Sequence, residues 1–314
     1  MKVVHGTMII ANQATMLVPE MRRRGVTAAT ISYYKTYLGY EADFEHPIAD
    51  IPDEAARRRS TTLIAASAMQ EFDVFHLWFN TSFTLDYSDL PMLANLDRPV
   101  FMQHAGSDVR TLEKAKAMNS WAVVKPMPPG QIHAQLSVIS RYIKTAIVGE
   151  ARLYEYVKDY YDKVHMVPIT IDLAGFPLSD EHLANERPLV VHAPTSPAYK
   201  GTKYVMAAVE KLKKRYDFDF QLVQGMPHEE AKKVYRRADI ILDQFLGGGV
   251  GSLATEGMAL GKTVLCWVCD RAREGYPEEP PVISANPDTL EAKLEMALNE
   301  PGLRRELGPR ARAY

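Results

Sequence analysis

The chain has 314 residues, a length that favours two domains rather than one. Its formal net charge is −2 with 24% charged residues, so it has no global cationic field of the kind that nucleic-acid binding requires. Two cysteines are too few for a secreted disulfide framework. The N-terminus lacks the apolar region of a signal peptide, and no stretch approaches the length of a transmembrane helix. We therefore expect a cytoplasmic protein.

Two local patterns have ordinary structural explanations. Cys266 and Cys269 form a CxxC pair, but no second pair of ligands completes a zinc site, so we expect packed core thiols and no bound metal, with redox chemistry as the alternative. The arginine runs at 22–24 and 57–59 are typical of solvated helix ends. A peripheral contact of these runs with an anionic membrane surface is left open as the alternative.

The first half of the chain alternates short apolar runs with amphipathic stretches, which predicts strands alternating with helices. The predicted strands are Lys2–His5, Thr27–Tyr33, Asp73–Phe79, Pro99–Gln103, Ala122–Val124, Ala146–Val148 and Val164–Pro168. The predicted helices are Thr15–Arg24, Glu54–Glu71, Asp89–Leu96 and Ala151–Tyr160. The stretch Ile132–Ile139 fits either type of element.

A looser segment with Gly175, Pro177 and Pro188 follows, and then the alternation begins again. Its predicted strands are Leu189–His192, Phe218–Val223, Ile240–Gln244 and Thr263–Val268. Its predicted helices are Lys203–Arg215, His228–Arg237, Ser252–Leu260 and Pro287–Leu298. The pattern predicts an α/β fold of two doubly wound, Rossmann-like domains facing each other across a cleft. We assign residues 1–170 to the first domain, 171–188 to a linker and 189–314 to the second domain.

The most informative segment follows the predicted strand Ile240–Gln244. Its loop carries four glycines, Gly247, Gly248, Gly249 and Gly251. Glycines let the backbone approach a ligand closely, and the helix that opens near Ser252 directs unpaired N–H groups toward an anion. Glu256 lies about one turn into that helix, where its carboxylate could reach a ribose diol. The spacing is not that of a P-loop, and a flexible surface loop is the alternative.

A second segment runs from His192 to Thr202, between the first strand and the first helix of the second half. Lys200 is a compact cation suited to a diphosphate, and Thr202 is placed to cap the following helix. The alternative for Lys200 is a plain surface lysine.

A third segment, Gln103–Arg110, follows a predicted strand of the first half. It brings His104 and Asp108 to the carboxyl end of that strand, where open α/β sheets bind ligands. A histidine at this position is as often structural as functional.

Together these segments resemble the retaining glycosyltransferases of the GT-B fold, in particular family 4, and the resemblance extends over most of the chain. The most specific match is Glu256-Gly-Met-Ala-Leu-Gly-Lys-Thr-Val264, where family members carry Glu-Ala-Met-Ala-x-Gly-Lys-Pro-Val. The stretches from His104 to Arg110 and from His192 to Thr202 also look like family motifs.

The resemblance implies an enzyme of the hexosyltransferase type that moves a sugar from a nucleotide-diphosphate sugar to an acceptor. It implies retention of the anomeric configuration and no metal or other cofactor, the nucleotide-sugar being a co-substrate. Glu256 would hold the donor ribose and Lys200 the diphosphate. His104 would lie against the donor sugar, with Asp108 as the second catalytic candidate.

The remaining candidates surround the donor. Gly225 and Met226 would meet the nucleobase. Further donor-side candidates are Thr195, Gly248, Gly249, Val250, Gly251 and Ser252. Gly6 follows the first predicted strand and is the acceptor-side candidate. Neither the acceptor, the donor's base and sugar, nor the oligomeric state follows from the sequence.

The sequence departs from the family pattern in three places, and the first two support an alternative function. Gly248 and Pro197 stand where the family usually has a glutamate and an arginine, and the chain ends at Tyr314, where the family's closing helices are expected. The alternative is a non-catalytic nucleotide-sugar-binding or scaffold protein. A sugar-nucleotide epimerase would use the same architecture. An NAD-dependent oxidoreductase is excluded because no GxGxxG stands at either first strand-to-helix turn.

Overall fold

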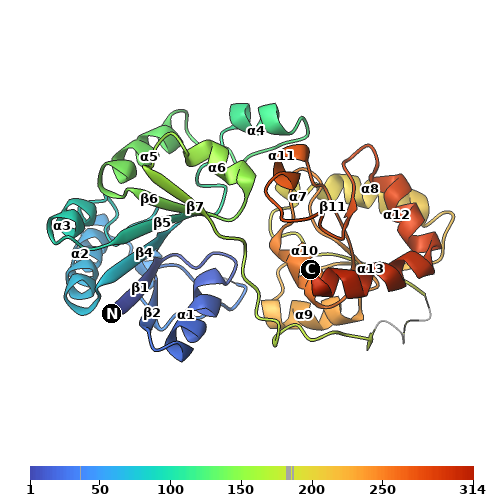
Figure 1. The fold of residues 1–314 in the computed structure, drawn as a ribbon, viewed down its shortest axis with the longest axis horizontal. Helices are drawn as coiled ribbons and strands as arrows, with labels where there is room; N and C mark the ends of the chain where they lie inside the picture. The colour runs from blue at the N-terminus through green and yellow to red at the C-terminus, as the bar shows by residue number, and fades with distance from the viewer. Residues whose placement is uncertain (36, 182–184, 186) are drawn as a thin grey trace. The chain divides into compact units, whose positions relative to one another are not determined.

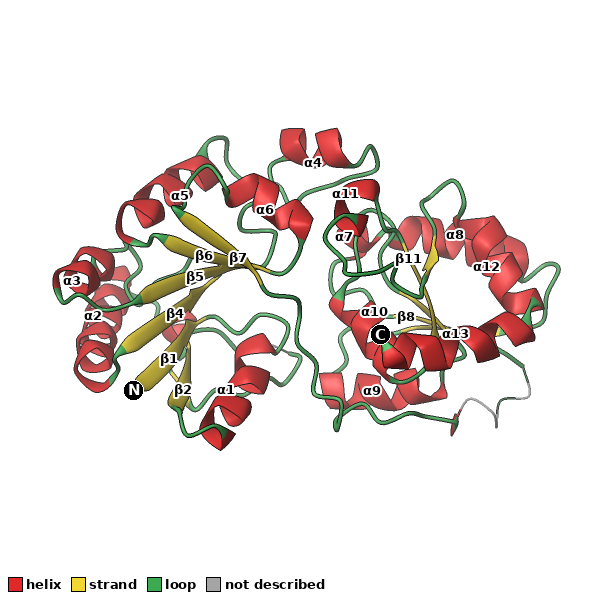
Figure 2. Cartoon of the chain, viewed as in Figure 1, coloured by secondary structure: helices red, strands yellow, loops and turns green. Residues whose placement is uncertain are grey.

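The computed structural model describes residues 1–35, 37–181, 185 and 187–314. The chain divides into two compact units, each built on one sheet (Figures 1 and 2). The first unit comprises Met1–Thr111 and Pro126–Thr170, and the second comprises Leu112–Lys125 and Ile171–Tyr314. Residues 112–125 therefore pack with the second unit although they lie in the first half of the sequence.

The first unit contains a seven-stranded sheet with the order β3-β2-β1-β4-β5-β6-β7. Its neighbouring strands pair in parallel. The strands are β1 (Lys2–Thr7), β2 (Thr27–Ser32), β3 (Phe44–Glu45), β4 (Val74–Trp78), β5 (Val100–His104), β6 (Thr145–Val148) and β7 (Lys163–Met166). Strand β1 continues through Gly6, where the sequence predicted a loop.

Helices cover both faces of this sheet, with α2, α3 and α5 along one face and α1 on the other (Figure 1). The helices are α1 (Gln13–Arg23), α2 (Glu54–Glu71), α3 (Asp89–Asn95), α5 (Gln131–Tyr142) and α6 (Ala151–Val157), with a 3-10 turn η1 (Ile48–Asp50). Helix α2 starts where predicted because the Asp53 carboxylate accepts the Ala56 amide at 2.7 Å, an N-cap. Among the described residues, no helix combines the length and the apolar character needed to cross a bilayer.

The second unit contains a five-stranded parallel sheet with the order β12-β11-β10-β8-β9. The strands are β8 (Leu189–His192), β9 (Asp219–Leu222), β10 (Ile240–Leu242), β11 (Thr263–Cys266) and β12 (Ile283–Ser284). The helices are α4 (Leu112–Met118), α7 (Pro197–Lys200), α8 (Thr202–Leu212), α9 (His228–Arg237), α10 (Ser252–Ala259), α11 (Asp270–Arg273), α12 (Leu290–Asn299) and α13 (Pro301–Ala313).

The core of the second unit explains why its central strands β8 and β10 are mostly apolar. Val191 and Ile241 pack in a cluster with residues of α9 and α10. Val190 and Leu242 pack in a second cluster with residues of α8 and α12. Alternate strand residues thus enter opposite layers, and burying each such side chain stabilises the fold by roughly 1.5–3 kcal/mol.

The predicted alternation of strands and helices is confirmed in both units, although one predicted strand is absent and helix α13 and the short elements β3, β12, α4, α7 and α11 were not predicted. Ala122–Val124 is not a strand: it belongs to the segment that packs with the second unit, where the Asn119 side-chain amide donates to the Leu246 carbonyl at 3.0 Å. Helix α13 was not predicted because prolines and glycines interrupt its sequence. It is anchored by the Arg312 guanidinium, which donates to the carbonyl of Phe176 at 2.5 Å and to that of Ala259 at 2.6 Å.

A pair of histidines lies inside the first unit, on neighbouring strands. His5 of β1 is only 3% exposed, and its ring lies 4.7 Å from that of His76 of β4. Its Nε2 faces the Met21 sulfur at 3.4 Å, while Nδ1 has no hydrogen-bond partner among the described residues. Protonation would therefore bury an unsatisfied charged donor. Burial lowers the pKa of His5 from 6.5 to about 4 and, together with His5, that of His76 to about 3.

Acid should destabilise the first unit through these histidines. Below pH 6.5 the unfolded chain takes up a proton at His5 that the folded chain does not bind until about pH 4, so stability falls as the pH falls through this window. The expected loss from His5 is on the order of 3 kcal/mol at the acid end. Urea unfolding of His5→Phe at several pH values should show a flatter pH dependence. Replacing the exposed His133 with Gln is the control, and equal slopes for His5→Phe and wild type would contradict the assignment.

Candidate functional site

The strand orders locate one switch point in each sheet, the place where successive strands are added on opposite sides. In the second unit it lies between β8 and β10, and in the first unit between β1 and β4. Ligands of open α/β sheets bind at the carboxyl ends of the strands beside such a point. The predicted donor segments follow β8 and β10, so both lie at the switch point of their sheet.

Lys200 and the glycine loop meet at a buried carboxylate. Lys200 ends α7, and its Nζ lies 2.5 Å from Oδ1 of Asp243, the residue directly after β10. The other oxygen, Oδ2, accepts the backbone N–H of Gly251 at 3.1 Å. The Asp243 side chain is fully buried, whereas that of Lys200 is 14% exposed. The lysine side chain therefore keeps some solvent access, whereas the carboxylate has none.

The glycine loop is held by contacts from three sides. The Gln244 side chain donates to the Gly249 carbonyl at 2.5 Å, and the Val250 amide donates to the Tyr276 hydroxyl at 2.9 Å. The Cys269 amide donates to the Gly248 carbonyl at 3.1 Å. These contacts argue against the alternative of an unstructured surface loop.

The loop ends at the N-terminus of α10. Gly251 is its N-cap residue, so the backbone amides of the first turn, from Ser252 onward, lack intrahelical acceptors. Together with the helix dipole, these amides favour an anion. The sequence had singled out Gly248, Gly249, Val250, Gly251 and Ser252 as donor-side candidates, and they form one continuous turn here.

Glu256 is paired with a histidine that the sequence did not single out. Its Oε1 lies 2.8 Å from Nε2 of His228, the first residue of α9. The side chains of Glu256 and His228 are 16% and 12% exposed, so the pair is reachable from solvent. No signal in the sequence linked the two residues, because they lie on different helices 28 positions apart.

The segment after β8 differs in one detail from its prediction. Thr202 does not cap α8: Gly201, with φ 79°, is the N-cap, and the Thr202 hydroxyl pairs with Nε2 of His192 at 2.9 Å. His192 Nδ1 donates to the Leu242 carbonyl at 2.8 Å, which ties β8 to β10, and burial lowers the pKa of His192. Thr195 lies exposed in the turn between β8 and α7.

Gly225 and Met226 lie between β9 and α9. Gly225 has φ 63° and open space around its Cα, whereas Met226 packs against the core cluster of α9 and α10. Their contact with a nucleobase stays a prediction.

In the first unit, His104 and Asp108 form a buried network with a tyrosine. His104 Nδ1 donates to Asp108 Oδ2 at 2.9 Å, and Nε2 pairs with the Tyr161 hydroxyl at 2.9 Å. Asp108 Oδ1 accepts the amides of Gly106 at 2.7 Å and Ala105 at 3.2 Å. His104 is 1% exposed, and burial together with the Asp108 charge raises the pKa of Tyr161. The network fixes the turn after β5, and the catalytic roles of His104 and Asp108 stay predictions.

Gly6, the acceptor-side candidate, lies near the carboxyl end of β1, beside the switch point of the first sheet. A Cβ at this position would meet the Phe83 ring at 3.2 Å, so the glycine allows the loop after β4 to pack on β1. Its contact with an acceptor stays a prediction.

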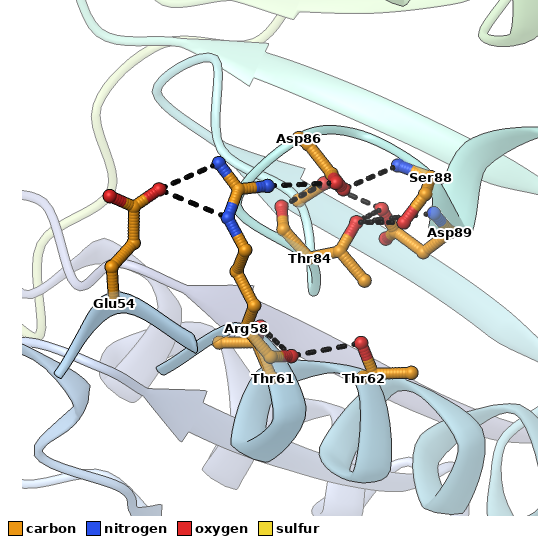
Figure 3. A network of polar contacts seen from close by, with 9 residues as sticks. Glu54, Arg58, Thr61, Thr62, Thr84, Asp86, Ser88 and Asp89 are labelled. Carbon is orange, nitrogen blue, oxygen red and sulfur yellow. Dashed lines mark hydrogen bonds and ion pairs between the residues drawn. The ribbon is translucent and has the colours of Figure 1, made fainter. Parts of the chain in front are cut away.

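The loop after β4 is organised by one buried carboxylate (Figure 3). Asp89 at the start of α3 accepts the hydroxyls of Ser82 at 2.7 Å and Thr84 at 2.6 Å, and the amide of Phe83 at 2.9 Å. These bonds tie the loop after β4 to the start of α3.

In the basic run at 57–59, Arg58 and Arg59 lie beside acids, and Arg57 donates to the Ile51 carbonyl at 3.2 Å. Figure 3 shows Arg58 between Glu54, at 2.9 Å, and Asp86, at 3.1 Å. Arg59 lies 3.7 Å from Asp53. These exposed pairs fit the interpretation of a solvated helix surface.

No family model and no curated protein matches the chain, but solved structures match it over nearly its whole length. A glycosyltransferase from Rickettsia africae is 15% identical with a TM-score of 0.68, and the match covers 99% of this chain and 92% of that one. HepE from Anabaena, crystallised with UDP-glucose, is 10% identical with a TM-score of 0.68, over 99% of this chain and 93% of that one.

The UDP-GlcNAc 2-epimerase from Neisseria meningitidis, bound to UDP-GlcNAc, is 13% identical with a TM-score of 0.58, over 98% of this chain and 94% of that one. At such identities the likeness shows the fold. The chain has the mixed α/β GT-B fold with two parallel sheets that its sequence predicted.

The space at Gly251 gives a direct test of this site. A Cβ there would lie 2.3 Å from Asp243 Oδ2 and 3.1 Å from Lys200 Nζ, distances that force the carboxylate or the loop to move. By displacing the loop and the first turn of α10 from Lys200, Gly251→Ala should weaken binding of inorganic pyrophosphate about tenfold or more and lower the unfolding temperature by several degrees. Gly302→Ala, at an open helical position, is the control. Unchanged pyrophosphate affinity in Gly251→Ala, measured by calorimetry, would contradict an anion site at this loop.

Proposed function

We propose that the chain is a glycosyltransferase that moves a sugar from a nucleotide-diphosphate sugar to an acceptor. The observation that supports this most is the convergence of Lys200, the glycine loop and the N-terminus of α10 at the switch point of the second sheet. These groups form an anion site, and Glu256 stands one turn further along the same helix. The fold likeness to HepE, crystallised with UDP-glucose, supports the same class of donor.

In this proposal, the second unit holds the donor by charge and by hydrogen bonds. Lys200 and the first-turn amides of α10 bind the diphosphate, and such pre-placed donors contribute several kcal/mol where charge develops on the leaving group. Glu256 accepts hydrogen bonds from the ribose hydroxyls, and His228 orients its carboxylate. Gly248 offers no side chain to the donor sugar.

We propose transfer of the hexosyltransferase type, with retention and without a metal. Asp108 is buried against His104, and Glu256 is paired with His228, so neither is a free nucleophile. This favours a front-face route in which the leaving phosphate accepts the proton of the acceptor hydroxyl. For His104 to contact the donor sugar, the ligand would have to replace Tyr161 at Nε2.

Two observations favour functions other than sugar transfer. Gly248 and Pro197 lack the side chains of the resembled family, which favours a nucleotide-sugar-binding protein without turnover. The likeness to the epimerase from Neisseria meningitidis favours isomerisation of the sugar.

One experiment separates these functions. Thermal unfolding with UDP, GDP, ADP and their sugars identifies the donor, because a ligand that binds the folded chain raises the unfolding temperature by mass action. The stabilising nucleotide-sugar is then incubated with the chain and a panel of hydroxyl acceptors, with and without EDTA. We expect nucleotide release and a glycoside of retained configuration, equal in both conditions. An isomerised nucleotide-sugar would identify an epimerase, and binding without release would identify a non-catalytic protein.

Lys200 and Glu256 should contribute separately to donor binding. Lys200→Ala should weaken binding of the free nucleoside diphosphate, and Glu256→Ala should weaken nucleoside binding, each about tenfold or more because a charge-assisted hydrogen bond is lost. Lys203→Ala and Glu210→Gln, both on the exposed surface of α8, are matched controls. Calorimetry that gives wild-type affinities for Lys200→Ala or Glu256→Ala would contradict the corresponding role.

A further inference from the structure

The anion site of the second unit already contains an anion. The Asp243 carboxylate contacts two of the groups that would bind an anion. Its Oδ1 lies 2.5 Å from Lys200 Nζ, and its Oδ2 accepts the Gly251 N–H at 3.1 Å. In the unliganded chain the lysine charge is therefore balanced before any phosphate arrives.

The loop is shaped around this carboxylate. Asp243 Oδ2 can approach the Gly251 backbone because Gly251 has no side chain. A Cβ at this position would lie 2.3 Å from Oδ2. Asp243 is fully buried and Lys200 is partly exposed, so the lysine is the member of the pair that is accessible from solvent. The carboxylate is too deeply placed to be screened well by salt.

A carboxylate in this place acts differently on the donor and on the product. Transfer breaks the bond between the anomeric carbon and the diphosphate oxygen, which keeps the electron pair, while the acceptor oxygen forms the new bond and releases its proton. The donor diphosphate carries one negative charge on each phosphate, and the released nucleoside diphosphate gains a further charge near neutral pH. Repulsion by a nearby buried carboxylate therefore costs the product more than the donor.

We propose that Asp243 limits the affinity of this site for diphosphate and weakens the hold on the product nucleoside diphosphate more than on the donor. The distinction between donor and product rests on the proposed function. The effect on affinity does not, because a buried carboxylate beside Lys200 opposes any polyanion that binds there.

The test compares two aspartates that flank the same strand. Asp239 precedes β10 and accepts the Leu189 amide at 2.9 Å, whereas Asp243 follows β10 and faces Lys200. Calorimetry at about pH 8 would measure inorganic pyrophosphate, UDP and UDP-glucose on wild type, Asp243→Asn and Asp239→Asn. Asp243→Asn should bind pyrophosphate about fivefold tighter or more, with a larger gain for UDP than for UDP-glucose. Asp239→Asn should match wild type.

Asp243→Asn leaves Lys200 without its counter-ion, and this variant could therefore fail to fold. A second comparison keeps the test valid in that case. It compares Lys200→Gln, which removes only the lysine charge, with the double variant Lys200→Gln/Asp243→Asn, which removes both charges. The double variant therefore leaves no unpaired ion. The double variant should bind pyrophosphate several-fold more tightly than Lys200→Gln alone.

The outcomes separate the inference from the proposed function. Equal or weaker pyrophosphate binding after loss of the Asp243 charge, in both comparisons, would overturn the inference, because a purely structural aspartate gives that result. Absence of UDP and UDP-glucose binding to wild type would count against a UDP-sugar donor, while the pyrophosphate comparison would still decide the role of Asp243.

Discussion

In the second unit, the ion pair between Lys200 and Asp243 connects the parts of the candidate site. It joins the segment after β8 to the end of β10, and through the Gly251 amide it fixes where α10 begins. Glu256 and the first-turn amides lie on the helix that starts there. A buried ion pair is seldom a strong source of stability, because removing two charges from water offsets their attraction. Its value here is geometric, since it aligns a cation and a helix N-terminus at the switch point of the sheet.

Much of the fold could be predicted from the sequence because its periodic signals are local. Helix α2 matches its prediction over Glu54–Glu71, since Asp53 supplies an N-cap and the apolar pattern has no breaker. Strands β8 and β10 were found as continuous apolar runs, the pattern of strands covered on both faces. Where local signals conflict, as with the prolines and glycines of α13, prediction failed because long-range contacts such as Arg312 to Phe176 decide the outcome.

The candidate site was predicted in its parts but not in its connections. Lys200, the glycine loop and Glu256 could be singled out because their chemistry and their places after strands are visible in the sequence. Asp243 was seen only as the end of a strand, and His228 as the start of a helix, because their partners lie 43 and 28 positions away. Side-chain partners at such separations are set by the packing of the sheet. For the same reason the sequence could not show that Tyr161 closes the network of His104 and Asp108.

The central claim is that Lys200, the glycine turn and Glu256 form one nucleotide-diphosphate site. A crystal structure of the chain with UDP, or with whichever nucleoside diphosphate stabilises it most, tests this directly. The account predicts a diphosphate between Lys200 Nζ and the first turn of α10, with the ribose hydroxyls on Glu256. A nucleotide bound elsewhere, with Lys200 and Glu256 untouched, would contradict it.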